Sequence, residues 1–261
     1  MRPLALVVCL LAVAFCSGCF QHTIRVTVKA DGSGSIAVRQ VISKATLANL
    51  QQQKGTLPGF DEARIKREAV QYGPDVQAVI VKEVNQADGQ GYLAVYQFPD
   101  INRVHIPAGK EPFRFTYRKG ELTVNSPRPP AASRTPAPTN AADESGSQNS
   151  FAKLIQAMGS PYGFSGDERP DAVARRILQD LKIFIELDLP EGTTTSQATH
   201  RDEAKKSRIR LIQVDGEMVA SKPAAVDTLL KADGRVPVEV LLSGLPGVRI
   251  EPKAKLTFKL Q

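Results

Sequence analysis

Cysteine is scarce in this sequence, and its distribution is uneven. The three cysteines of the 261-residue chain are Cys9, Cys16 and Cys19, and none occurs in residues 20–261. No disulfide can therefore form within that part of the chain, which excludes a small fold built on a disulfide framework. The length instead allows one large domain or two small ones, each with a hydrophobic core.

Histidine is equally sparse, and recognised catalytic patterns are missing. His22, His105 and His200 lie far apart, with no spacing of histidine or cysteine that could hold a metal. No serine lies in a G-x-S-x-G pattern. The acidic pair Asp202-Glu203 falls in a polar stretch, where neighbouring charges are usually solvated. We therefore expect no metal, no cofactor and no enzymatic activity.

Long hydrophobic runs are absent beyond the first twenty residues. Residues 4–15 are mostly aliphatic, follow the basic residue Arg2 and are followed by the small pair Ser17-Gly18. A membrane-spanning helix needs about 20 apolar residues, so this run is too short to be one. A charged start, a short apolar run and a small-residue cut site are typical of a secretory signal peptide, here residues 1–18.

The residue after the small pair is Cys19, which makes this stretch similar to a bacterial lipoprotein signal. The resemblance implies that Cys19 is acylated and becomes the first residue of the mature protein, although Cys16 stands where an aliphatic residue is usual. Two or more acyl chains hold a protein stably to a bilayer. We expect a mature chain in the cell envelope, outside the cytoplasm and tethered by lipid to a membrane. The alternative is an ordinary cut near Ser17 that leaves a free thiol on Cys19.

The charge balance is modestly basic, with a formal net charge of +7. Such a balance favours anionic surfaces such as phospholipid headgroups, and no nucleic-acid-binding motif is present, so we expect no nucleic-acid partner. The densest basic cluster has two interpretations. Its residues could meet headgroups, or they could be the exposed face of a strand. The cluster consists of Lys205, Lys206, Arg208 and Arg210.

Alternation of apolar and polar residues with a period of two predicts most of the secondary structure. In residues 23–30, Ile24, Val26 and Val28 share one face, and Asp31-Gly-Ser-Gly34 is typical of a tight reversal into a returning strand. Further strands are predicted over 76–84, 92–98, 113–118, 121–125, 181–189, 208–214, 236–242 and 253–260, and helices over 43–53, 61–72 and 170–179. Lys119-Gly120 is predicted to reverse the chain between two of these strands, and Pro170 is predicted to be the first residue of the last helix. The fold class is α+β, a mainly antiparallel sheet of hairpins packed against one or two helices.

Residues 126–150 differ in composition from their surroundings. They contain five prolines between Pro127 and Pro138 and no large apolar residue, so they cannot bury enough surface to offset the entropy of ordering. We expect a disordered segment that either links two domains or interrupts one. It separates a first α+β part, residues 19–125, from a second part, residues 151–261, with extra C-terminal strands.

Six aromatic residues cluster on the predicted central strands. Either they form the core on one face of the sheet, or they line a ligand groove. They are Tyr92, Tyr96, Phe98, Phe113, Phe115 and Tyr117.

The order of these features resembles the LppM-type bacterial lipoprotein domain over roughly residues 19–215. The resemblance rests on Cys19 followed at once by a strand and Asp31-Gly-Ser-Gly34, on residues 91–100 and 113–122, and on residues 181–192. It implies antiparallel strands packed against a helix on the cell surface, and the binding of lipid or glycolipid. The proline-rich segment and the β tail depart from that family, and the resemblance assigns no binding residue in this chain.

Two functions from different classes follow. The first is a membrane-anchored, non-enzymatic binding or interaction module whose partner is a lipid or an envelope protein. The second is a structural envelope lipoprotein with no small ligand. An open pocket lined by aromatics between helix and sheet would favour the first, and a solid core there the second.

Overall fold

The computed structural model describes residues 20–44, 47, 60–87, 89–108, 111–127, 169–193, 198–202, 204–231 and 244–260. The predicted signal peptide, Cys19, nearly all of the proline-rich segment and the predicted strand over 236–242 lie outside the described residues. Most of the helix predicted over 43–53 does so too.

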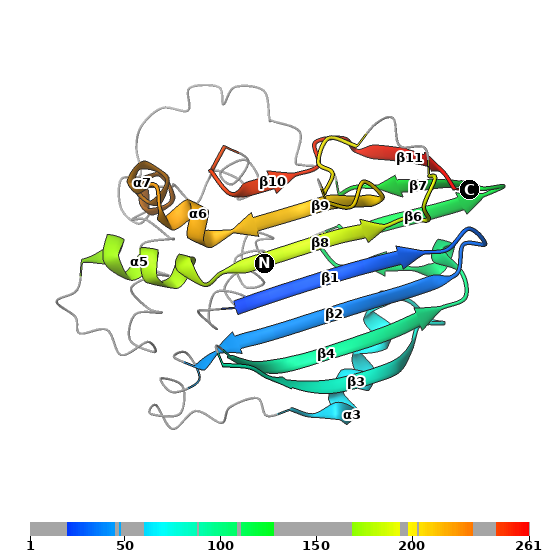
Figure 1. Cartoon of the computed structure of the whole chain (residues 1–261), viewed down its shortest axis with the longest axis horizontal. Helices are drawn as coiled ribbons and strands as arrows, with labels where there is room; N and C mark the ends of the chain where they lie inside the picture. Colours follow the sequence, from blue (N-terminus) through cyan, green and yellow to red (C-terminus); the bar gives the residue numbers. More distant parts are fainter. Residues whose placement is uncertain are drawn as a thin grey trace, which may run out of the picture.

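A seven-stranded sheet forms the larger layer of the described structure (Figure 1). Its strand order is β10-β9-β8-β1-β2-β4-β3. The strands are β1 (Phe20–Val28), β2 (Gly34–Ser43), β3 (Gln77–Asn85), β4 (Gly89–Phe98), β8 (Lys182–Asp188), β9 (Arg208–Asp215) and β10 (Val248–Ile250). The hairpin of β1 and β2 has the predicted location, with Val28 opposite Gly34 across the turn.

A four-stranded antiparallel sheet forms the second layer. Its order is β11-β7-β6-β5, from β5 (His105–Ile106), β6 (Phe113–Arg118), β7 (Glu121–Asn125) and β11 (Lys255–Lys259). The turn between β6 and β7 is the predicted Lys119-Gly120 pair, and both residues have positive φ, as a two-residue hairpin requires. The predicted C-terminal strand is confirmed and completes the sheet beside β7.

Short helices flank the sheets. Asp61 accepts a hydrogen bond of 2.9 Å from the backbone amide of Arg64 and caps α3 (Glu62–Arg67), which continues into the 3-10 helix η1 (Glu68–Tyr72), as predicted. A second 3-10 turn, η2 (Ile101–Arg103), follows β4. Helix α5 (Pro170–Gln179) has its predicted bounds, whereas α6 (Gly216–Ala220) and α7 (Pro223–Lys231) were not predicted.

The main core lies between the two sheets and α3. The inward residues of β1 are almost completely buried, with Val26 0% exposed, and Phe113 of the second sheet is 2% exposed. A second apolar cluster joins α5, α6 and α7 to the ends of β8, β9 and β10. The described fold is α+β and mostly antiparallel, as the sequence predicts, but its strands form two sheets where one was expected.

Strands from the two sides of the proline-rich segment pair with each other in both sheets. β1 pairs with β8, and β7 pairs with β11. The pairing of β1 with β8 is parallel, the one such pairing among the described strands. The two parts of the chain therefore contribute to the same layers.

Candidate functional site

A continuous polar row crosses the outer face of the seven-stranded sheet. Each member lies opposite the next one in the register of neighbouring strands, so all of the side chains project from the same face. Their neighbours along each strand point the other way, into the core. The row consists of Gln77, Gln97, Ser35, Thr27, Asp188 and Arg208, one each from β3, β4, β2, β1, β8 and β9.

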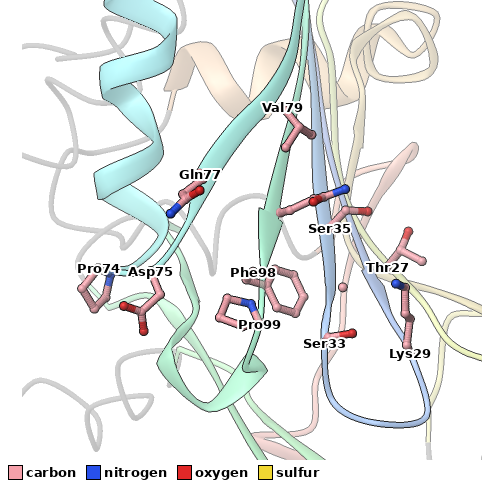
Figure 2. Close-up of a pocket in the computed structure, with 12 residues that line it drawn as sticks. Thr27, Lys29, Ser33, Ser35, Pro74, Asp75, Gln77, Val79, Phe98 and Pro99 are labelled. Atoms are coloured by element: carbon pink, nitrogen blue, oxygen red, sulfur yellow. The ribbon is translucent and has the colours of Figure 1, made fainter.

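The first four members of this row lie in an open groove of about 650 Å³ at the end of the sheet where β1 turns into β2. One rim carries Lys29 and Ser33, and the opposite rim carries Pro74 and Asp75. Figure 2 shows these two rims on either side of Phe98 and Pro99. The four row residues on the groove surface bear hydroxyl or amide groups and no charge. We call this group, Thr27, Ser35, Gln77 and Gln97, the groove floor.

The first rim is the tip of the hairpin of β1 and β2, and hydrogen bonds hold its conformation. The amide and hydroxyl of Ser33 donate hydrogen bonds of 2.9 and 2.7 Å to the carboxylate of Asp31, and these bonds lower the pKa of that carboxyl. Gly32 has φ +83°, a conformation that few other residues adopt without strain. The hydroxyl of Tyr117 donates to the carbonyl of Ala30, which ties the tip to the second sheet.

The second rim is held close to η2. A Cβ on Gly73 would lie 2.4 Å from the carbonyl oxygen of Arg103, so only glycine allows this approach of the two backbones. Asp75 forms an ion pair with Arg103. The same 3-10 turn also contacts the first rim, because the amide of Ile101 donates a hydrogen bond of 2.9 Å to the carbonyl of Gly32. One short segment thus fixes the separation of the two rims.

Charged residues continue the polar row beyond the groove. Arg208 donates two hydrogen bonds to Asp188, at 2.8 and 3.2 Å, and Lys205 donates one at 3.2 Å. Burial opposes ionisation of Asp188, but these hydrogen bonds outweigh it and keep the pKa of the carboxyl below its ordinary value. In the adjacent row, Glu186 lies between Arg25 and Arg210. We use the name charge cluster for these residues together with Asp202: Arg25, Glu186, Asp188, Asp202, Lys205, Arg208 and Arg210.

The charge cluster corrects two expectations. Arg208 and Arg210 are half-buried and paired with carboxylates, so they form neither a plain exposed strand face nor a free basic patch. Asp202 was expected to be solvated, but it is 8% exposed and its carboxylate lies 2.8 Å from Arg210. A guanidinium group supplies the hydrogen bonds that water would otherwise provide, which makes this burial tolerable.

Five of the six aromatic residues form core, as one of the two interpretations predicts, and Tyr117 is partly buried against that core. Tyr92, Tyr96 and Phe98 point inward from β4, and Phe113 and Phe115 point inward from β6, all at most 8% exposed. They belong to two facing sheets, which corrects the expectation of one face of one sheet. The buried hydroxyl of Tyr96 donates to the carbonyl of Ile65 at 3.0 Å, and burial raises its pKa to about 12. These side chains fill the space between helix and sheet.

The predicted lipidation site, Cys19, lies outside the described residues, but the strand that follows it does not. β1 begins at Phe20, the next residue in the chain. The three histidines lie on separate elements: His22 in β1, His105 in β5 and His200 before β9. Among the described residues, no three His, Cys, Asp or Glu side chains gather where they could hold a metal ion. Within the same residues, no helix combines the length and apolar character needed to cross a membrane.

Comparison of the chain with family models, with curated proteins and with solved structures finds no match. The similarity to the LppM-type domain therefore remains a prediction from the sequence. The groove was not predicted. Its one local signal was the run of polar residues at alternate positions of the strands, and such a run is also what any solvent-facing strand carries.

Proposed function

We propose that this chain is an exported lipoprotein, held on a membrane of the cell envelope by acylated Cys19, and that it acts there as a non-enzymatic binding module. The observation that carries the proposal is the signal-like sequence of residues 1–18 followed by Cys19, and the structure adds that β1 starts at the next residue, Phe20. Consecutive Cα atoms are about 3.8 Å apart, so a lipid on Cys19 is joined to a central strand with no linker between them.

The position of the groove supports a role in binding a partner away from the anchor. β1 runs from Phe20 to Val28, and the groove lies at its far end, beside Thr27 and Lys29. At about 3.3 Å per residue, that end lies about 25 Å along the strand from the lipid. A ligand from the envelope space can reach the groove there.

The packed core between the two sheets limits the kind of ligand that the chain can bind. Tyr96 is 0% exposed and Phe113 is 2% exposed, and both belong to the main core. A lipid tail would have to displace these residues from a packed core, at a cost of several kcal/mol. The module we propose therefore binds a polar molecule, or the polar part of a lipid, on its outer face.

Metabolic labelling tests the anchor. Cells that express the full chain are fed an alkyne fatty acid, and the protein is checked for the label and for membrane association. The wild type and the Cys9→Ala and Cys16→Ala variants should be labelled, whereas Cys19→Ala should not. An unlabelled wild type, or a labelled Cys19→Ala protein, contradicts the proposal.

The alternative is a structural envelope lipoprotein without a small ligand, and the solid aromatic core favours it. The two functions differ in what co-purifies with the chain. Native mass spectrometry of the full chain, released from a mild detergent, should show an additional mass for a binding module. A protein that carries its acyl groups and nothing else favours the structural alternative.

A further inference from the structure

We infer that the groove binds an uncharged, hydroxyl-rich chain, a glycan that lies across the strands of the sheet. This inference rests on the proposed binding function and names the class of ligand for it. The groove floor supports it first by its chemistry. Gln77 and Gln97 carry amides, and Ser35 and Thr27 carry hydroxyls, so every floor residue can both donate and accept hydrogen bonds. Sugar hydroxyls have the same dual capacity.

The spacing of the floor matches an extended polymer. Its four residues come from four adjacent strands, β3, β4, β2 and β1, and each lies opposite the next. Neighbouring strands are about 4.8 Å apart, so the floor presents one polar side chain at each such interval over about 14 Å. That interval is comparable to the length of one sugar ring in an extended glycan. A chain across the strands can therefore meet a hydrogen-bonding group at each unit.

The groove also offers apolar surface beside the polar floor. Pro74 and Pro99 are exposed and line the groove, and Val79, which also lines it, is 48% exposed. Figure 2 shows both proline rings at the groove surface. Sugar rings have C–H faces as well as hydroxyl groups, and small apolar side chains can pack against those faces. The combination of an uncharged polar floor and apolar flanks suits a carbohydrate.

The charges around the groove argue against an anionic ligand. Among the residues that line it, Lys29 is the cation and Asp75 the anion, and they lie on opposite rims. Strong phosphate sites use several donors of charge-assisted hydrogen bonds that converge on one point. The arginines of the charge cluster do not supply them, because Arg208 and Arg210 already pair with carboxylates.

The groove is held in its shape before a ligand binds. The Ser33 and Asp31 hydrogen bonds hold one rim, the ion pair of Asp75 with Arg103 holds the other, and η2 contacts both. A preformed site loses less conformational entropy on binding than a flexible one. This favours the weak, repeated hydrogen bonds that a glycan makes.

The experiment measures binding to the full chain, purified in a polyoxyethylene detergent, which carries no sugar. The probes are maltotetraose, a linear tetramer of N-acetylglucosamine, and inorganic phosphate, each titrated by calorimetry. Phosphatidylcholine vesicles with and without a glucosyl lipid distinguish a glycolipid headgroup from a free glycan. The variants are Gln97→Ala and Gln77→Ala, which remove exposed side chains. Gln90→Ala is the matched control, because Gln90 is an exposed glutamine of the same strand as Gln97 but lies near its other end.

We expect at least one tetramer or the glucosyl lipid to bind. Gln97→Ala and Gln77→Ala should each weaken that binding by about tenfold, as expected for the loss of one or two good hydrogen bonds. Gln90→Ala should change it by less than about twofold. Lys29→Ala is measured with phosphate, to show whether any phosphate binding depends on that cation. Binding that survives both floor variants, phosphate binding that depends on Lys29, or the absence of carbohydrate binding overturns the inference. Labelling at Cys19 and the co-purified mass are measured independently of glycan binding. A negative result with the glycans therefore contradicts this inference without contradicting the proposed binding function.

Discussion

The guanidinium group of Arg25 lies 2.9 Å from the carboxylate of Glu186, although 161 residues separate them in the chain. The contact crosses the parallel pair β1 and β8, which joins the part of the chain before the proline-rich segment to the part after it. The side chain of Glu186 is 7% exposed and also lies within 3.8 Å of Arg208 and Arg210. A buried carboxylate thus has three cationic neighbours from two strands.

Removing the charge of Glu186 should destabilise the fold. In Glu186→Gln the shape is kept, but three guanidinium groups lose a buried anionic partner. We expect the free energy of unfolding to fall by about 1 to 3 kcal/mol. Urea denaturation followed by circular dichroism measures it. Glu83→Gln is the control, since Glu83 is exposed on the edge strand β3. Equal stability of the two variants would show that the charge cluster contributes nothing net.

Acid should weaken the charge cluster through Asp188. The pKa of this carboxyl lies below its ordinary value of 3.8 in the folded chain, because the hydrogen bonds from Arg208 and Lys205 outweigh the effect of burial. A lowered folded pKa gives stability that is present above pH 3.8 and lost as the pH falls below it. Asp188→Asn should be less stable than the wild type at pH 7, with a smaller difference at pH 2.5. A difference that does not change with pH contradicts this assignment.

His22 should make the free energy of unfolding depend on pH in a higher range than Asp188 does. It shares the inward face of β1 with Ile24, and burial lowers its pKa from 6.5 to about 4. Protonation then favours the unfolded chain, so stability should fall as the pH drops from 6.5 to 4, by about 2 to 3 kcal/mol in all. His22→Leu should flatten this slope, while Thr23→Val, on the opposite face, should retain it. The measurement is the urea midpoint at several pH values. An unchanged slope in His22→Leu would exclude His22 as its source.

Alanine substitutions at Gly32 and Gly120 should distinguish two causes of destabilisation when a turn glycine is replaced, backbone strain and a steric clash. Both have positive φ, but a Cβ on Gly32 would lie 2.6 Å from the ring of Tyr117, whereas the nearest atom to a Cβ on Gly120 is 3.7 Å away. Gly120→Ala should cost about 1 kcal/mol from backbone strain alone. Gly32→Ala should cost about 2 to 3 kcal/mol, since the ring of Tyr117 must also move. Thermal unfolding compares the two. A smaller loss for Gly32→Ala would mean that the hairpin tip is not held against Tyr117.

The last strand should be essential for stability. Phe258 is 0% exposed, and its strand β11 closes the edge of the second sheet beside β7. Phe258→Ala should lower the free energy of unfolding by about 3 to 5 kcal/mol, because it leaves a cavity in the main core. The adjacent Thr257→Ala, on the other face, should cost less than about 1 kcal/mol. Chemical denaturation of both variants tests this. A small effect of Phe258→Ala would show that β11 is not packed as described.

Local patterns in the sequence were enough to predict most elements of the described structure. The alternation in residues 23–30, the reversal at Asp31-Gly-Ser-Gly34 and the turn at Lys119-Gly120 predicted two hairpins, and the structure contains both. Pro170 predicted the first turn of α5. These predictions hold because turn chemistry and side-chain period act over a few residues. The helices α6 and α7 were missed because short helices depend more on packing than on intrinsic propensity.

The groove could not be predicted in the same way. Thr27, Ser35 and Gln97 read as ordinary outward residues of three strands, and their alignment depends on register and strand order. Asp202 could not be recognised as buried, because its partner Arg210 comes from a strand rather than from its own loop. The pairing of Arg25 with Glu186 could not be predicted either, because it depends on β1 and β8 lying side by side in the sheet.

The amino-acid sequence alone predicts the anchor at Cys19, the hairpins and the α+β class, because each depends on neighbours within a few residues. Tertiary structure decided which strands pair across the proline-rich segment, that the aromatics of β4 and β6 face one another from two sheets, and that the polar row forms a groove floor. Those outcomes depend on contacts between residues that are distant in the sequence, from Ser35 opposite Gln97 to Arg25 with Glu186 and Val124 with Leu256. The free energy of such contacts is not determined by any local pattern.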